Sequence, residues 1–279
     1  AVLLVGEPGC GAGFAARCLA ADYLYPAGGP HAEAVLKKED TECLVLQGEG
    51  ASGQIPVKKV REAREAIQRS ALSTDAAGRV LFIYGAQNLN GSSANAMLKI
   101  IEEPPDGVLF LLTATSAATV LPTIRSRCAA YTIAPVPAAD CAARLKAERL
   151  PAKAAEELAF LYEGHIGTAL KSWNDPTAKA ALGMAKTLCG YAAQGDTYRA
   201  LALLTKYERD KDGFAALLWT LDQLCSAVLR RPAYGQEQCG GLTPAGAAKI
   251  LNADARARKS LTGNGNLRLN VAVLAGEIA

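Results

Sequence analysis

The feature that most constrains this chain is a strand-helix-strand pattern within residues 79–128. Two apolar runs, Val80–Ile83 and Val108–Thr113, are short and rich in branched and aromatic residues, which is typical of strands buried on both faces. Between them, residues 92–103 have apolar side chains at helical spacing, and two prolines follow. Two buried strands joined by a helix form a right-handed parallel crossover. The pattern therefore predicts an α/β fold built on a parallel sheet.

The ends of these elements carry the first local predictions. Ser92 or Ser93 stands where a side chain can accept a hydrogen bond from the first free amides of the helix. In parallel sheets the functional groups lie just past the carboxyl ends of the strands. We therefore expect residues 84–87 and 113–116 to border any site on this domain.

A glycine-rich loop, GEPGCGAG, joins a predicted first strand to a predicted helix near the start of the chain. Gly6, Gly9 and Gly11 give it the frame of the phosphate-binding loop GxxxxGK[ST]. However, Ala12 stands where that loop has its lysine, and Gly13 stands where it has the hydroxyl that ligates magnesium. The loop is therefore degenerate in both of its reactive positions.

The second half of an ATPase site is also missing from the sequence. Tyr84, Gly85 and Ala86 follow the strand at Val80–Ile83, where an ATPase carries the carboxylates that hold magnesium. Lysine, hydroxyl and carboxylate contribute separately to metal and transition-state binding. We therefore expect no intrinsic ATPase activity, no cofactor and no metal. Two interpretations of the glycines stay open: they are a structural remnant that preserves the turn, or their backbone amides bind an anion weakly.

Three segments in order, ANAMLKIIEEPP, LLTAT and LPTIRSRC, resemble the AAA+ module of bacterial clamp-loader subunits, and within it the delta-prime family of DNA polymerase III. The resemblance extends over most of the chain. It implies an AAA+ P-loop-type parallel sheet domain at 1–136, a small helical lid domain at 137–174 and an all-helical collar domain at 175–279. Family members often carry a four-cysteine zinc module and a helical segment before the first strand, and this sequence shows neither pattern.

The same resemblance implies a role for Arg127 within the triplet Ser126-Arg127-Cys128. In the family this arginine reaches the ATP site of the neighbouring subunit, and Ser126 and Cys128 belong to its motif. A permanently charged guanidinium can stabilise a phosphoryl group during transfer, so we expect an arginine finger in trans. From the residues alone, the alternative is that Arg125 or Arg127 pairs with a carboxylate at the end of the sheet domain.

Helices dominate the sequence after the proline-spaced linker APVP. The clearest apolar stripe, at i, i+3 and i+4 spacing, runs from Phe214 to Val228. Thr168 stands where, by the resemblance, the lid domain has a nucleotide-sensing arginine, and His165 is expected to be buried or to cap a helix. The expected helices cover 138–148, 153–162, 176–194, 196–208, 211–230, 243–261 and 266–278.

Composition excludes several classes of protein. Half of the 279 residues are hydrophobic, yet no apolar run approaches the roughly 18 residues of a membrane span. Eight cysteines show no CxxC pair, which favours reduced thiols and a cytoplasmic protein. The net charge of +3 comes from scattered Lys and Arg and does not by itself indicate nucleic acid. An amphipathic helix is predicted at 55–72, in a region that lies near DNA in clamp loaders, and phosphate contact and a solvated face are equal alternatives for it.

The function expected from all of this is that of a non-hydrolysing, delta-prime-like subunit of the DNA polymerase III clamp loader. It would support the complex and supply Arg127 during ATP-dependent loading of the sliding clamp onto primed DNA. The expected partners are clamp-loader ATPase subunits, a delta-type subunit, the clamp and, through the complex, primed DNA, with no membrane. The alternatives are an ATP-hydrolysing subunit of the same superfamily and an AAA+ interaction module outside replication.

Overall fold

The computed structural model describes all residues except 51–52, 69–72, 74, 264 and 279. Residues 1–136 and 165–167 form one compact unit, and residues 137–164 and 168–279 form a second. The first unit contains a fully parallel sheet with the order β2-β3-β4-β1-β5, as the strand-helix-strand pattern predicts. Its strands are β1 (Val2–Val5), β2 (Cys43–Gln47), β3 (Arg79–Tyr84), β4 (Val108–Ala114) and β5 (Ala129–Thr132).

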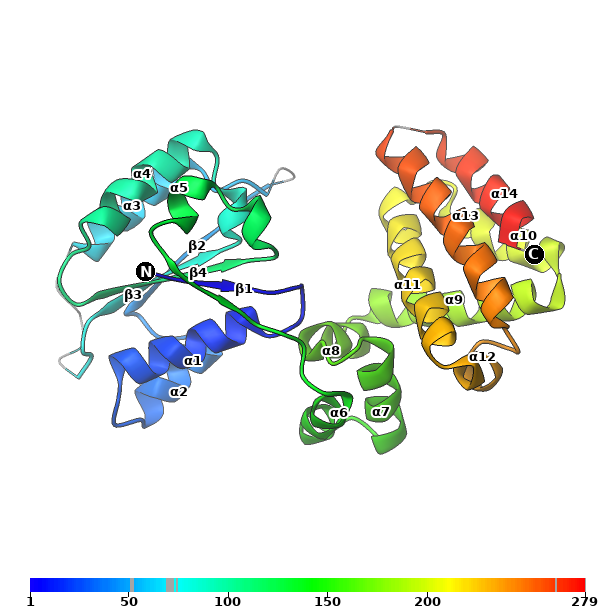
Figure 1. Ribbon diagram of the computed structural model, residues 1–279, viewed down its shortest axis with the longest axis horizontal. Coiled ribbons are helices and arrows are strands. Elements are labelled where there is room, and N and C mark those ends of the chain that lie inside the picture. Colours follow the sequence, from blue (N-terminus) through cyan, green and yellow to red (C-terminus); the bar gives the residue numbers. More distant parts are fainter. Residues whose placement is uncertain (51–52, 69–72, 74, 264, 279) are drawn as a thin grey trace. The chain divides into compact units, whose positions relative to one another are not determined.

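Helices cover both faces of this sheet (Figure 1). On one face lie α1 (Ala12–Leu24) and α2 (Pro30–Lys37), and on the other lie α3 (Val57–Ile67), α4 (Gly91–Glu102) and α5 (Pro122–Arg125). Alternate residues of β3 serve the two cores: Val80 packs beneath α1, and Leu81 packs with the residues of α3 and α4. This two-sided burial explains why the strand reads as a continuous apolar run. Two short 3₁₀ turns complete the unit, η1 (Ala86–Asn88) and η2 (Ala117–Thr119).

The prediction for the start of α4 is wrong by two residues. Asn90, not Ser92 or Ser93, caps the helix, because its Oδ1 accepts a hydrogen bond from the amide of Ser93 at 2.9 Å. The Ser93 hydroxyl donates back to the same side-chain oxygen at 3.0 Å. Asparagine and serine are equally good caps, so composition could not separate them, and only the path of the chain places Asn90 outside the helix.

Several short elements had no counterpart in the sequence-based prediction. They are α2, α5, β5 and, in the second unit, α12 (Pro232–Gln238). All four residues of β5 are exposed, so this edge strand lacks the apolar run that identifies β3. The helix predicted at 55–72 begins at Val57 and ends at Ile67, and residues 69–72 of that prediction lie outside the described residues.

A buried ion pair joins three segments of the sheet unit. Arg79 at the start of β3 donates from Nε to Glu42 Oε2 at 3.1 Å, and the Glu42 side chain is fully buried. The other carboxylate oxygen of Glu42 accepts from the amide of Ser73 at 2.7 Å, and Arg79 Nη1 reaches the Ala66 carbonyl of α3. The pair therefore ties the end of α3 to the amino ends of β2 and β3.

Breaking this pair should be costly, because it leaves a buried charge without its partner. We expect Glu42→Ala to lower the free energy of unfolding by about 3 to 5 kcal/mol in urea titrations. Glu62→Ala is the matched control, since it breaks the exposed Lys58–Glu62 pair and should cost less than about 0.5 kcal/mol. Equal losses in the two variants would contradict the structural role of Glu42.

The second unit is entirely helical in its described residues, and the helices predicted at 176–194 and 211–230 are confirmed at both ends. The apolar stripe from Phe214 to Val228 is buried as predicted. Among the described helices, none is both long and apolar enough to cross a membrane. The helices are α6 (Ala138–Ala147), α7 (Ala152–Leu161), α8 (Ile166–Asn174, whose first two residues belong to the first unit), α9 (Pro176–Gln194), α10 (Thr197–Leu204), η3 (Thr205–Tyr207), α11 (Lys211–Arg230), α12, α13 (Pro244–Thr262) and α14 (Leu267–Ile278).

Side chains of α7 hold this helix against the bundle formed by α9 to α14. Lys186 of α9 pairs with Glu157, and Tyr234 of α12 donates to the same carboxylate at 3.2 Å. Tyr162, which follows α7, stacks on Trp219 of α11 with ring centroids 5.8 Å apart. These ionic and aromatic contacts explain why the helices that follow the linker belong to the same compact unit as the C-terminal bundle.

A buried carboxyl group lies where α13 packs on α11. Asp254 accepts from Arg258 Nε at 2.6 Å, and Arg258 also donates to the Leu218 carbonyl of α11 at 2.7 Å. Burial raises the pKa of Asp254 to about 6; Arg258 opposes this effect, and the nearby Asp222 adds to it. The folded unit therefore holds this proton more tightly than the unfolded chain does.

This raised pKa predicts how stability changes with pH. The raised pKa of Asp254 contributes about 3 kcal/mol to the free energy of unfolding. This contribution is fully present below about pH 4 and is lost as the pH rises through about 6. Asp254→Asn should remove this part of the pH dependence in thermal or urea unfolding between pH 4 and 7. An unchanged slope in the variant would mean that another group causes it.

Candidate functional site

The degenerate phosphate loop joins β1 to α1, and its glycines have conformational reasons to be there. Gly9 and Gly11 have φ angles of 90° and 101°, and Gly11 is the N-cap of α1. Non-glycine residues rarely adopt such angles. Gly6 has an ordinary φ, but a Cβ atom there would lie 2.4 Å from Cys10 Sγ. The three glycines are thus required by the turn itself, whether or not an anion binds.

Two other side chains lie near the position of the missing hydroxyl. A Cβ atom built on Gly13 would lie 3.4 Å from the ring of Tyr84 and 3.9 Å from Arg17 Nη1. Arg17 donates from Nη1 to the Gly13 carbonyl at 3.0 Å, and the Tyr84 ring stacks on Phe82. Tyr84 therefore stands at the end of β3, where the carboxylate is expected, and its ring would lie in ordinary van der Waals contact with a side chain at position 13.

The loop also bonds to a later segment of its own compact unit. The amide of Gly167 donates to the Gly9 carbonyl at 2.9 Å, and a Cβ atom on Gly167 would lie only 3.0 Å from Gly9 Cα. His165 Nε2 lies 3.1 Å from a carboxylate oxygen of Glu7. The histidine thus contacts the loop, whereas the sequence suggested only burial or a helix cap.

The carboxyl ends of β3 and β4 lie next to each other, as their parallel pairing requires. Thr113 Oγ1 accepts from the amide of Gly85 at 3.2 Å, so these ends bond to one another. Within the described part of the chain, no group of three or more His, Cys, Asp and Glu side chains is arranged to hold a metal ion. The donor set here does not fit magnesium-dependent nucleotide chemistry.

Arg127 lies after α5, on the exposed side of the unit, and it pairs with Glu102 at the end of α4. Its Nη2 and Nε lie 2.5 and 2.6 Å from Glu102 Oε1, and the two side chains are 39% and 45% exposed. Nη1 donates to the Thr123 carbonyl at 3.1 Å. Ser126 is exposed and Cys128 is half-buried. The carboxylate pairing considered as an alternative for this arginine is thus present.

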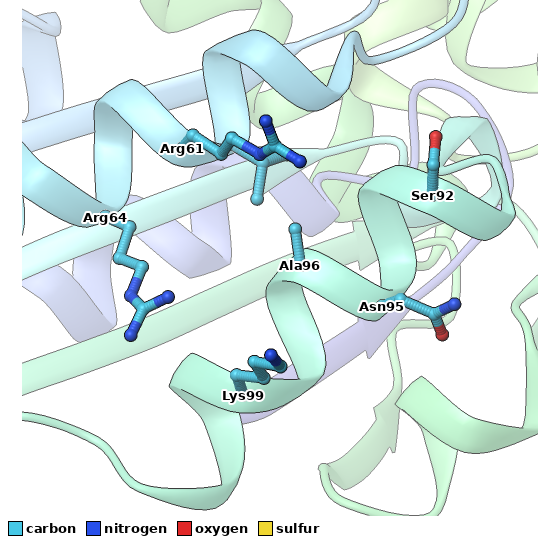
Figure 2. Close-up of a pocket in the computed structure, with 7 residues that line it drawn as sticks. Arg61, Arg64, Ser92, Asn95, Ala96 and Lys99 are labelled. Atoms are coloured by element: carbon cyan, nitrogen blue, oxygen red, sulfur yellow. The ribbon is translucent and has the colours of Figure 1, made fainter.

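A basic pocket lies between α3 and α4, with a volume of about 360 Å³ (Figure 2). Arg61 and Arg64 extend from α3 towards α4, where Lys99 lies one turn beyond Ala96. Among the described residues, none of the three cations forms an ion pair. The pocket is lined by Val60, Arg61, Arg64, Ser92, Asn95, Ala96 and Lys99.

Sequence reasoning found only part of this pocket. It predicted the amphipathic helix at 55–72 that carries Arg61 and Arg64, but it did not connect either residue to Lys99. The basic residues belong to two helices that are about 35 residues apart along the chain, so no single stretch of sequence shows them as a cluster. Only the packing of the two helices brings the charges together. Three unpaired cations around one concave surface can bind successive phosphate groups.

Comparisons with known proteins show which proteins this chain resembles. A family model described as DNA polymerase III, delta subunit, matches residues 1–137. The DNA polymerase III subunit delta' of Escherichia coli is 29% identical over 210 residues, 75% of this chain and 57% of that protein. Subunit delta' of Pseudomonas aeruginosa is 35% identical over 130 residues, 45% of this chain and 38% of that protein.

A solved structure adds to the comparison of the fold. The crystal structure of a DNA polymerase III gamma subunit-related protein from Thermotoga maritima matches with a TM-score of 0.51 at 15% identity, over 100% of this chain and 95% of that one. At this identity the likeness shows the fold alone. The chain spans about half the length, or less, of the curated relatives it matches.

Proposed function

Because this chain is a delta-prime-like member of the clamp-loader family of DNA polymerase III subunits, we propose that it is a subunit that does not hydrolyse ATP itself. The observation that carries this proposal is that the magnesium-ligating hydroxyl of the phosphate loop is replaced by Gly13, and the carboxylates expected at the end of β3 by Tyr84 and Gly85. Ala12 removes the lysine as well. An isolated chain incubated with ATP and magnesium should release no phosphate.

The three parts of the chain would divide the work of such a subunit. We assign the AAA+ role to residues 1–136, the lid to residues 137–174 and the oligomerising collar to residues 175–279. The partners in this proposal are clamp-loader ATPase subunits, a delta-type subunit and the sliding clamp, and primed DNA is reached through the assembled complex. A clamp-loading assay on primed DNA, with this chain omitted and then restored, tests the proposal as a whole.

Arg127 is the residue that we propose to act in catalysis, as a finger on a neighbouring ATP site. Its exposure and its position after α5 leave the guanidinium accessible from outside the unit. The pair with Glu102 does not oppose this role, because ion pairs at this exposure contribute only about 0 to 1 kcal/mol. A γ-phosphate, with its greater charge, can compete for the same guanidinium.

The finger role predicts a loss of activity in a site that this chain does not contain. In a complex reconstituted with ATPase and delta-type subunits, Arg127→Ala should lower turnover at one site by about 10³-fold or more while assembly stays intact. Glu102→Ala is the matched control: it removes the ion pair but keeps the guanidinium, so turnover should be retained. Unchanged DNA-stimulated ATP hydrolysis in the Arg127 variant would overturn the finger role.

The basic pocket between α3 and α4 supports a second contact, with the DNA backbone. Its cations lie on neighbouring turns of two packed helices, and Ser92 and Asn95 add neutral hydrogen-bonding groups at the same surface. Phosphate contacts position a protein on DNA without selecting a sequence, which suits a loader that acts on any primed site. Of the two alternatives for the helix at 55–72, we therefore propose phosphate contact.

This contact predicts a specific dependence on salt. Replacing Arg61, Arg64 and Lys99 together with alanine should weaken binding of the assembled complex to primed DNA. The slope of the logarithm of the binding constant against the logarithm of the salt concentration should become shallower by about 2 to 3. Lys58→Ala is the control on the same helix, because Lys58 pairs with Glu62 and lies outside the pocket. Equal salt slopes for the triple variant and the wild type would exclude the pocket as a DNA contact.

A further inference from the structure

Three buried cysteines lie together in the core of the helical unit. They are Cys189 of α9, Cys225 of α11 and Cys239, the residue at which α12 ends, and each of them is 0% exposed. The Cys189 thiol lies within hydrogen-bonding reach of both other thiols. All three are free cysteines. The fold thus brings three thiols from separate helices into contact, although the sequence shows no pairing motif between them.

The backbones that carry Cys189 and Cys239 come into contact at the next residue of each segment. A Cβ atom built on Gly240 would lie 2.7 Å from Gly190 Cα, so only glycine permits this approach of the turn to α9. Gly240 also has a φ angle of 62°, which favours glycine. A disulfide requires the two Cα atoms to lie within about 7 Å of each other. Two touching thiols beside touching backbones can therefore be joined with little rearrangement.

Cys239 is the thiol of this pair that ionises more readily. The hydrogen bond with Cys189 lowers the pKa of Cys239. The positive charge of Lys186 lowers it as well, while burial and the carboxylate of Glu157 act in the opposite direction. The same cluster raises the pKa of Cys189 well above its ordinary value, through its hydrogen bonds to Cys225 and Cys239. Because the thiolate is the reactive form of cysteine, Cys239 is the nucleophile and Cys189 keeps its proton.

A cavity of about 190 Å³ between α7 and α12 lies next to this nucleophile. Gln238, which lines the cavity, precedes Cys239 in the chain, and Glu157, whose charge acts on Cys239, lines it too. Lys186 binds both lining residues, since it pairs with Glu157 and donates to Gln238 Oε1 at 3.2 Å. A polar cavity of this volume has room for a few molecules the size of water, and hydrogen peroxide is not much larger.

We propose that Cys239 and Cys189 form a peroxide-sensitive thiol pair, which hydroperoxides that enter this cavity convert to a disulfide. The Cys239 thiolate attacks one oxygen of the peroxide, the O–O bond breaks, and the other oxygen leaves as hydroxide. Sulfur is thereby oxidised to a sulfenic acid, and the peroxide is reduced. Cys189 then attacks the sulfenic sulfur, so the S–S bond forms while the S–O bond breaks.

The protons balance in this sequence. The hydroxide from the peroxide takes up the proton that Cys239 had released, and the sulfenic oxygen leaves as water with the proton of Cys189. Two thiols and one hydrogen peroxide molecule thus give one disulfide and two water molecules. The new bond ties α9 to the end of α12 and encloses α10 and α11 in a covalent loop. This chemistry is separate from the proposed function and does not depend on it.

The test treats the reduced full chain with hydrogen peroxide and maps its thiols by mass spectrometry. The wild type should lose two of its eight thiols, with the peptides of Cys189 and Cys239 linked, and a reductant should restore both. Cys141 of α6 is the internal control, because it is also 0% exposed and burial raises the pKa of its thiol. It should stay reduced at the same dose. Linkage of Cys189 to Cys225, or equal oxidation of Cys141, would overturn the proposal.

Two serine variants separate the steps of the reaction. Cys189→Ser keeps a hydrogen-bond donor beside Cys239 but cannot form the S–S bond, so a sulfenic acid on Cys239 should persist and react with dimedone. Cys225→Ser is the matched control, because it removes the other neighbour of Cys189 and leaves the reacting pair, so the disulfide should still form. A disulfide that depends on Cys225, or a Cys189 variant without sulfenic acid at Cys239, would contradict the assignment.

The rate of thiol loss distinguishes reaction in the folded unit from reaction after unfolding. Reaction through the cavity should be first order in peroxide and should not change in urea concentrations below the unfolding transition. Reaction of the unfolded chain instead follows the population of that chain, which rises with urea. A rate that increases with urea in this range would therefore overturn the role of the cavity and the proposal with it.

Discussion

Hydrogen bonding between five parallel strands is the constraint on which the rest of the sheet unit depends. β3 pairs with β4 over its whole length and with β2 from Val80 to Tyr84. Since parallel strands need crossover connections, this pairing forces α1 to α5 onto the two faces and brings all the carboxyl ends to one edge. The phosphate loop and the Tyr84 turn meet at this edge for that reason. The Glu42–Arg79 pair then holds the opposite ends of β2 and β3 together.

The phosphate loop shows how an architecture can persist without its chemistry. Its path depends on the backbone angles of Gly9 and Gly11 and on the space at Gly6. Nucleotide chemistry depends instead on side chains at the next two positions, which here are alanine and glycine. Because different atoms carry the two properties, one can be lost while the other is kept. A chain of this kind can therefore retain an AAA+ fold without the side chains that nucleotide chemistry requires.

The two proposed functional surfaces differ in how far the sequence could predict them. Arg127 was singled out by its motif, although the residues alone could not decide between a finger and a carboxylate pair, and the pair with Glu102 is present in the free chain. The basic pocket was not predicted as a pocket, because Arg64 and Lys99 belong to helices that meet only in the folded unit.

By itself, the sequence determined the sheet, the long helices of the bundle and the loss of ATPase side chains. These features follow from local patterns: continuous apolar runs, helical stripes such as Phe214 to Val228, and residue identity at Ala12 and Gly13. Only the tertiary structure decided that Asn90 caps α4, that β5 forms an exposed edge, and that separate helices combine their charges in one pocket. The physical reason is that these outcomes depend on which segments pack together, and packing is not encoded in any one stretch of the chain.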